Sequence, residues 1–449
     1  MSETLLRGGP PLSRRNLLGA LGAGVGTVAL AGCSGGAPES TSVPSKPGKI
    51  EGDLTVSVFG TNQDQIDSFE TLFEGYKKKY PDVNLQVRGI AASDWANYFN
   101  TISTQIAGGD PPDVVQVATE GMRLFSSKGL VTPLDGYIER DKSEVQEFLD
   151  DVSSHFVDQV NTYENSGGKT YYLPGSFNTM CMWCNVSMFE EAGVDEPNND
   201  WTWDDFLHAC EEISKLGGDV LPFGAVNGAA GYFTGIEPWL LSNSANTMNQ
   251  AWDKATMNTP EAIEAVSFVR DLVDKGYMPG PGGKADPVAL VAQGKSAMVG
   301  GGRWPLAPMR DQDRVKDLKI VAWPNNAEKG TPVGWNSYPI MDASENKEAA
   351  WALVKFMFSA DAEKEFAKGG GTIVPARKSV AQSDVFTQNA PKGTPELYNS
   401  IDYATVIPSP NKNNVVAREL TEWLERILTG NVSVEEGCNG LNDAIQAAL

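Results

Sequence analysis

The sequence predicts an α/β protein whose chain opens with a mainly parallel sheet covered by helices. Two kinds of pattern alternate along the first part of the chain: apolar residues at every second position, typical of strands, and apolar residues at helical spacing. A β-α-β-α-β order of this kind favours parallel strands with helices on their faces. The five segments are the strand 54–58, the helix 66–80, the strand 85–87, the helix 93–106 and the buried strand 114–117.

Capping residues predict where several helices begin. Asp64 and Ser93 are expected to cap the first two helices, since short polar side chains can accept a hydrogen bond from the first helical turn. Thr202 precedes the acids 204–205, a pattern that capping and the helix dipole explain without catalysis. Thr259 precedes a proline, which favours the first helical position.

Residues 1–32 have the features of an export signal. A pair of arginines precedes the uncharged run Leu17–Ala31, which is shorter than the about 20 apolar residues of a bilayer span. Leu30-Ala31-Gly32-Cys33 resembles the lipobox of bacterial lipoproteins, and Ser13-Arg14-Arg15 resembles a twin-arginine signal. The lipobox resemblance implies that Cys33 carries a lipid anchor; the alternative is an ordinary signal peptide with an incidental cysteine. Residues 33–50 are rich in Ser, Gly and Pro, which predicts a flexible tether.

The composition excludes several classes of function. The formal net charge of -22 argues against a nucleic-acid partner, which needs clustered basic residues. Only His155 and His208 are present, and their neighbours lack metal-ligand spacing, so neither a metal nor a cofactor is expected. Gly294-Lys295-Ser296 lacks the first glycine of a phosphate loop, because Ala289 stands there. No G-x-S-x-G nucleophile motif occurs, and no catalytic residue is assigned.

The cysteines give no clear redox signal. Cys181 and Cys184 have the spacing of a redox motif but lie in a strand-like run, where residues three apart face opposite sides. Core packing is therefore the better interpretation. The sequence leaves open how Cys181, Cys184, Cys210 and Cys438 pair, if they pair at all.

Several tryptophans follow residues that interrupt regular structure. Trp239 follows a proline, Trp304 follows Gly300-Gly301-Gly302-Arg303, and Trp335 follows a glycine. Rings in such places often lie at a surface or cleft, where aromatic faces stack on the C–H groups of a ligand. The alternative for each ring is packing inside its own domain.

Five motifs, in order along the chain, resemble those of extracellular solute-binding protein family 1, the sugar-binding proteins of ABC importers. The resemblance spans the whole chain after the tether. The motifs are Gly109–Val115, Lys169–Pro174, Gly294–Met298 with Gly302–Trp304, Gly334–Asn336 with Asn346–Trp351, and Gly371–Arg377.

This resemblance implies two α/β lobes joined by a three-segment hinge, with a ligand cleft between them. The lobes would comprise 51–175 plus 340–372 and 178–335 plus 377–449. The protein would be a monomeric, non-enzymatic lipoprotein on the outer face of the cytoplasmic membrane. It would close over a sugar or oligosaccharide and deliver it to the permease of an ABC importer.

The resemblance also implies a set of ligand contacts on both lobes. For Asp64 a capping role is the alternative, and for Glu120 a solvated loop acid. Because Gln116 and Val117 stand where relatives carry an aromatic residue, Trp95 is expected to substitute for it. The implied contacts are Asn62, Gln63, Asp64, Trp95, Glu120, Asn178, Tyr232, Glu237, Trp239, Trp304 and Trp335.

Two other functions remain open from the sequence. An exported glycoside hydrolase would need two facing carboxylates about 5 to 10 Å apart, and the sequence offers no obvious pair. The same fold could instead bind a polyamine, a phosphate ester or a peptide.

Overall fold

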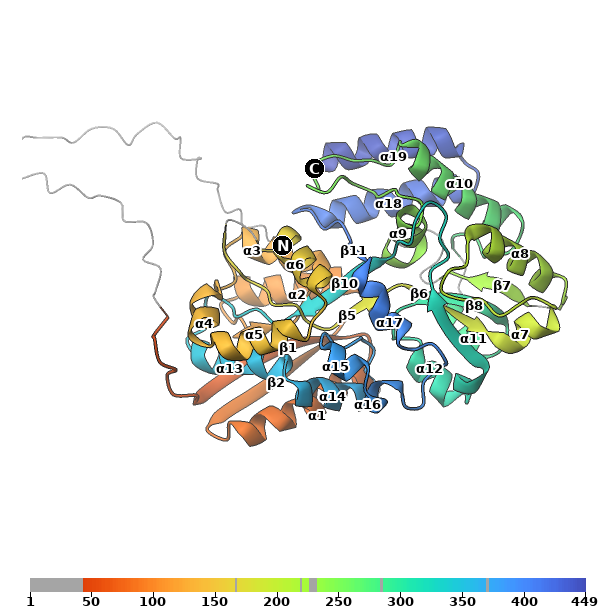
Figure 1. The fold of residues 1–449 in the computed structure, drawn as a ribbon. Coiled ribbons are helices and arrows are strands. Elements are labelled where there is room, and N and C mark those ends of the chain that lie inside the picture. Colours follow the sequence, from red (N-terminus) through yellow and green to blue (C-terminus); the bar gives the residue numbers. More distant parts are fainter. Residues whose placement is uncertain (1–42, 166–167, 219, 226–231, 283–285, 369–370) are drawn as a thin grey trace, which may run out of the picture. The chain divides into compact units, whose positions relative to one another are not determined.

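The computed structural model describes residues 43–165, 168–218, 220–225, 232–282, 286–368 and 371–449 (Figure 1). Its first sheet has the order β2-β1-β3, and both pairs of neighbours are parallel. The three inward apolar residues of β1 are fully buried. The predicted parallel opening of the chain is therefore confirmed. Its elements are β1 (Gly52–Gly60), α1 (Gln63–Lys79), β2 (Val83–Ala91), α2 (Trp95–Ala107) and β3 (Val114–Val115).

The first two helices begin at different caps from those predicted. Asn62, in an extended conformation, accepts a hydrogen bond from the backbone N–H three residues on, at 3.0 Å. Asp94 does the same for α2 at 2.8 Å. The expectations for Asp64 and Ser93 are thus wrong: Asp64 lies inside the first turn, and the Ser93 hydroxyl donates to the carboxylate of Asp94. A side chain can cap only from the extended position just before the helix.

A second sheet has the order β7-β8-β6-β9. β7 and β8 are parallel, whereas β6 runs antiparallel to both β8 and β9. Every residue of β6 is buried, and the two cysteines on it are free thiols, as are Cys210 and Cys438. The strands are β6 (Cys181–Asn185), β7 (Leu221–Gly224), β8 (Ser296–Gly301) and β9 (Leu318–Ala322).

One strand, β10 (Pro332–Ser337), joins segments that are far apart in the sequence. It pairs antiparallel with β4 (Val117–Ala118) and β5 (Phe177–Thr179), and parallel with β11 (Thr405–Val406). The strand predicted over 114–117 is consequently divided, because β3 pairs with β1 while β4 pairs with β10. The lobe boundaries expected from the sequence stay a prediction.

Helices complete the described part of the chain, and among them none is both long and apolar enough to cross a membrane. The predicted cap of α8 is confirmed, since Thr202 and Asp205 form a reciprocal capping box. Three short turns, η1 (Tyr232–Ile236), η2 (Val315–Asp317) and η3 (Ser400–Asp402), accompany the α-helices, and η1 is a π-helix. The remaining helices are α3 (Thr119–Ser127), α4 (Asp135–Arg140), α5 (Lys142–Asp150), α6 (Ser154–Tyr163), α7 (Val186–Glu191), α8 (Trp203–Ser214), α9 (Glu237–Leu241), α10 (Pro260–Asp274), α11 (Pro287–Ala292), α12 (Leu306–Asp311), α13 (Lys347–Met357), α14 (Ala360–Lys368), α15 (Lys378–Ala381), α16 (Asp384–Thr387), α17 (Glu396–Asn399), α18 (Asn413–Leu428) and α19 (Val434–Ala448).

A glycine lets the segment before β5 pass close to β10. A Cβ atom at Gly175 would overlap the carbonyl oxygen of Asn336, which is backbone and cannot rotate away. We expect Gly175→Ala to lower the free energy of unfolding by about 1–3 kcal/mol, the usual cost of overpacking, and to lower Tm in a thermal melt. Gly108→Ala is the matched control, because its nearest contact is 3.3 Å away and its φ of -77° is helical. Equal Tm values for the two variants would contradict this prediction.

Candidate functional site

Asn178 links three segments of the chain beside β10. It lies on β5 directly opposite Gly334. Its side-chain oxygen accepts a hydrogen bond from the backbone N–H of Arg303 at 2.9 Å, and its amide donates to the carbonyl of Thr372 at 3.2 Å. The Asn178 side chain, predicted to contact a ligand, therefore connects the segment after β8 with the segment before α15.

Trp304 lies next to this link. A Cβ atom at Gly302 would come within 2.5 Å of both the Asn178 oxygen and the Trp304 ring, so only glycine permits this approach. The Trp304 ring is half-buried, and its centroid lies 6.5 Å from that of Phe233 on η1. Phe233 in turn lies beside Gly334. The structure thus brings Asn178 and Trp304 together and adds Phe233, which the sequence analysis missed although it follows the predicted Tyr232.

A second group of predicted residues lies at the carboxyl edge of the first sheet. The Trp95 ring stacks on Phe59 at 4.2 Å between centroids, and both rings are half-buried. The side chain of Gln116 accepts the backbone N–H of Phe59 at 2.9 Å, which fixes the end of β1. Residues 62–64, all exposed, follow directly. Carboxyl edges of parallel sheets are common ligand sites. The sequence analysis did not single out Phe59, although alternation along β1 places it on the face opposite the buried residues of that strand.

Two of the predicted tryptophans are core residues. Trp335 is 2% exposed and packs edge-on against Phe156 and Tyr172. Trp239 is 1% exposed and belongs to an aromatic cluster in which the Trp323 ring lies 4.9 Å away. In this arrangement neither ring has a face free for a ligand, and the structure gives both a packing role.

The predicted acids differ in their surroundings. Glu120, at the start of α3, is half-buried, and burial raises its pKa. Glu237 is fully buried, and neither of its carboxylate oxygens has a hydrogen-bond partner among the described residues. Burial raises the pKa of Glu237 to about 8. Glu164, which the sequence analysis did not single out, is similar: burial raises its pKa to about 8, although the nearby Arg123 guanidinium opposes the rise.

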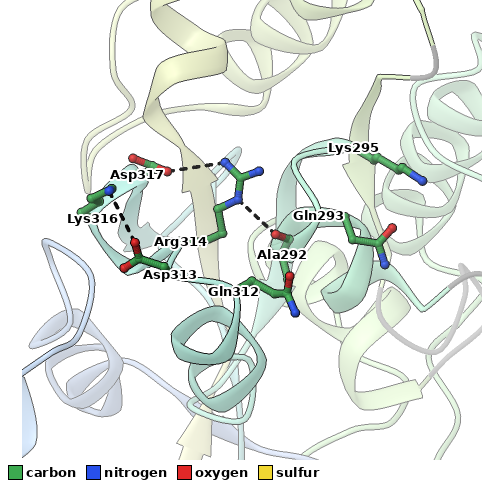
Figure 2. Close-up of a pocket in the computed structure, with 8 residues that line it drawn as sticks. All are labelled: Ala292, Gln293, Lys295, Gln312, Asp313, Arg314, Lys316 and Asp317. Atoms are coloured by element: carbon green, nitrogen blue, oxygen red, sulfur yellow. Dashed lines mark hydrogen bonds and ion pairs between the residues drawn. The ribbon is translucent and has the colours of Figure 1, made fainter.

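A polar cavity of about 440 Å³ lies away from these residues, between the end of α11 and η2 (Figure 2). Its charged side chains are largely engaged with one another. Arg314 donates to the carbonyl of Ala292 at 3.2 Å and pairs with Asp317 at 3.6 Å, while Lys316 pairs with Asp313 at 3.6 Å. None of the predicted ligand contacts lines this cavity.

Two predicted residues cannot be placed as side chains. Cys33 lies outside the described residues, and for Tyr232 the structure describes only the backbone, in η1. Within the described ranges, no group of three or more His, Cys, Asp or Glu side chains is arranged to hold a metal ion.

The buried Glu237 predicts a pH-dependent stability. Below about pH 4.5 the Glu237 carboxyl is neutral in both the folded and the unfolded protein. Between pH 4.5 and about 8 the unfolded chain loses this proton while the folded protein keeps it. The free energy of unfolding therefore falls as the pH rises through this range. Glu237→Gln removes this cost. We expect its Tm relative to wild type to increase by about 2 °C or more between pH 5 and pH 9. The control, Glu70→Gln at an exposed position, should show a constant difference; a constant difference for Glu237→Gln would refute the assignment.

Comparison with known proteins places this arrangement in a family. The family model described as bacterial extracellular solute-binding protein matches residues 61–364. The arabinooligosaccharide-binding protein of Bacillus subtilis is 24% identical over 343 residues, which cover 74% of this chain and 73% of the relative.

Solved structures share the fold. An ABC substrate-binding protein of Listeria monocytogenes in complex with cycloalternan has a TM-score of 0.75 and 23% identity, covering 88% of this chain and 98% of that one. The GacH receptor of Streptomyces glaucescens, solved unliganded and with acarbose, has a TM-score of 0.73 and 21% identity, covering 89% and 98%. These neighbours have the two-lobe fold of periplasmic binding proteins, which confirms the expected fold class. The chain therefore belongs to the family of bacterial extracellular solute-binding proteins.

Proposed function

We propose that this protein is the substrate-binding lipoprotein of an ABC importer and that it captures a sugar or oligosaccharide. The observation that carries the proposal is the half-buried Trp304 ring, held beside Phe233 and Asn178 at the strands that join the two sheets. An indole face in such a position can stack on the C–H face of a sugar ring. The named ligands of relatives, an arabinooligosaccharide and cycloalternan, support a carbohydrate over other solutes.

The solute would lie between Trp304 and the carboxyl edge of the first sheet. Stacked Phe59 and Trp95 offer a second aromatic surface there, and the exposed residues 62–64 offer amide and carboxylate groups for sugar hydroxyls. Binding would favour a rotation about β10 that brings this edge toward Trp304, because the solute contacts both sides only in the closed arrangement.

Capture without chemical change fits the family, whose named relatives are binding proteins. A phosphate ester is the non-sugar solute with some support, since one solved structure of this fold contains glycerophosphocholine. That compound therefore serves as the non-carbohydrate comparison in the test below.

The ligand prediction can be tested by calorimetry. We expect the purified protein to bind at least one of arabinooligosaccharides, maltose, maltotriose, cycloalternan and acarbose, without forming a product. Trp304→Ala should raise its Kd about 30-fold, which corresponds to about 2 kcal/mol of lost stacking and burial. Trp423→Ala, on α18, is the control and should leave Kd unchanged. Turnover of a saccharide, or binding of glycerophosphocholine alone, would contradict the proposal.

The lipid anchor at Cys33 is a separate proposal that rests on the sequence resemblance alone. In a bacterial host that processes lipoproteins, the wild-type protein should partition into the detergent phase of a Triton X-114 extract. Cys33→Ser removes the acylated thiol, and we expect that variant in the aqueous phase. The variant Ser34→Ala keeps the cysteine and should behave as wild type. Equal partitioning of wild type and Cys33→Ser would exclude the anchor.

A further inference from the structure

The chain already contacts the body of the protein before the first strand begins. Residues 43–51 precede β1, and two of them, Val43 and Ile50, are half-buried and pack against the hydrophobic core. The residues between these two are exposed. We call residues 43–50 the strap. Two prolines, Pro44 and Pro47, restrict its backbone and reduce the entropy that it loses when it lies against the body.

One end of the strap lies on α4. A Cβ atom at Gly136, in the first turn of this helix, would come within 2.7 Å of the Cγ2 atom of Val43 and within 2.9 Å of its Cβ atom. Alanine is the better helix former, so α4 alone gives no reason for glycine at this position. The contact with Val43 does give one, because it occupies the space that a side chain would fill.

The middle of the strap crosses the start of α13. A Cβ atom at Gly48 would lie 3.0 Å from the Cγ atom of Glu348. The carboxylate of Glu348 accepts a hydrogen bond from Arg140 of α4 at 2.7 Å, and the side chain of Arg140 is only 5% exposed. The strap therefore runs beside a nearly buried ion pair. We call Gly136, Arg140 and Glu348 the α4–α13 junction.

We propose that the strap fixes the point from which the lipid tether leaves the body and thereby holds the α4–α13 junction toward the membrane. The inference rests on the proposed lipid anchor at Cys33. The nine residues 34–42 between Cys33 and Val43 span at most about 35 Å, whatever their conformation. If the strap were detached, the sixteen residues 34–49 would span up to about 60 Å. A shorter tether raises the effective concentration of the protein at the membrane, where the permease of an importer lies.

Limited proteolysis tests whether the strap is docked. Trypsin can cut the strap after Lys49 but cuts poorly after Lys46, which precedes a proline. A docked segment must first detach to enter the protease, so the cleavage rate reports the detached fraction. In the full chain with Cys33→Ser, Gly136→Ala should raise the rate of cleavage after Lys49 about tenfold, which corresponds to about 1.4 kcal/mol. The reason is that the added methyl group displaces Val43.

Val43→Asp should have the same effect, because it places a charge where the strap packs against α4. Ser45→Ala is the matched control: Ser45 is an exposed residue of the strap, so its replacement should leave the rate at the wild-type value. Gly136→Ala should not lower Tm, because alanine favours α4. Cleavage of Gly136→Ala and Val43→Asp at the wild-type rate would overturn the docking of the strap.

Energy transfer to the membrane tests the orientation. The helices α4 and α19 lie far apart (Figure 1), and Glu139 and Glu435 are exposed positions on them. A donor dye is attached to Glu139→Cys or to Glu435→Cys, and lipid headgroups of the vesicles that hold the lipidated protein carry the acceptor. The native cysteines of the described residues are buried and should not react. We expect stronger transfer from position 139 than from position 435, and Gly136→Ala should remove the difference.

Failure of the anchor and failure of the strap give different results. Absence of wild type from the detergent phase refutes the lipid anchor, whereas the proteolysis still decides whether the strap is docked. Equal transfer from positions 139 and 435 in the lipidated protein overturns the orientation, whichever solute the protein binds.

Discussion

The backbone pairing of β10 is the constraint on which the rest of the structure depends. This strand of six residues pairs with three others that come from distant parts of the sequence. The hydroxyl of Thr119 strengthens the pairing, since it accepts the N–H of Trp335 and donates to its carbonyl. The segment before β5 passes so close that only Gly175 fits against Asn336. Backbone hydrogen bonds of β10 thus link β4, which follows a strand of the first sheet, to β5, which precedes a strand of the second.

Alternation along this strand assigns different tasks to its two faces. The Gly334 face has room for Phe233, because glycine presents no side chain there, and Trp304 lies near Asn178, the strand partner of Gly334. The Trp335 face is filled by the rings of Phe156, on α6, and of Tyr172, in the segment before β5. A packed face resists separation, whereas a face with half-buried rings can accept a solute. Alternation along β10 therefore places Trp335 in the core and leaves the face of Gly334 without a side chain of its own.

The sequence predicted the parts of the fold that depend on local pattern. The parallel opening of the chain and the Thr202 cap follow from periodicity and capping chemistry, which act within a few residues. The division of 114–117 into two strands could not be predicted, because it depends on β10, more than 200 residues away. For the same reason turn context alone could not separate Trp304 from Trp335. Glycine lies two positions before Trp304 and directly before Trp335. Only the neighbours that pack around each ring decide its exposure.

The polar groups nearest Trp304 are largely used to hold the chain in place. Asn178 is hydrogen-bonded at both ends of its amide. Arg303 is fully buried, has no carboxylate partner among the described residues, and donates to the carbonyls of Gly371 and Phe386 while lying 3.9 Å over the Phe386 ring. Burial lowers the pKa of Arg303 to about 9, so keeping this cation inside the protein costs free energy. The segment before Trp304 is thus held by hydrogen bonds of Arg303 and Asn178.

The engagement of these polar side chains has a consequence for specificity. If Asn178 and Arg303 are engaged by the backbone, they supply few free hydrogen bonds to a solute, and Trp304 supplies mainly an apolar face. Discrimination between saccharides would then come from groups at the carboxyl edge of the first sheet, where Asp64 is exposed, whereas Asn62 already caps α1 and the Gln63 amide already donates to Asp67. In the proposed function these groups would reach the solute on closure, so specificity and the conformational change would be coupled: a solute that cannot satisfy them gains too little to favour the closed arrangement.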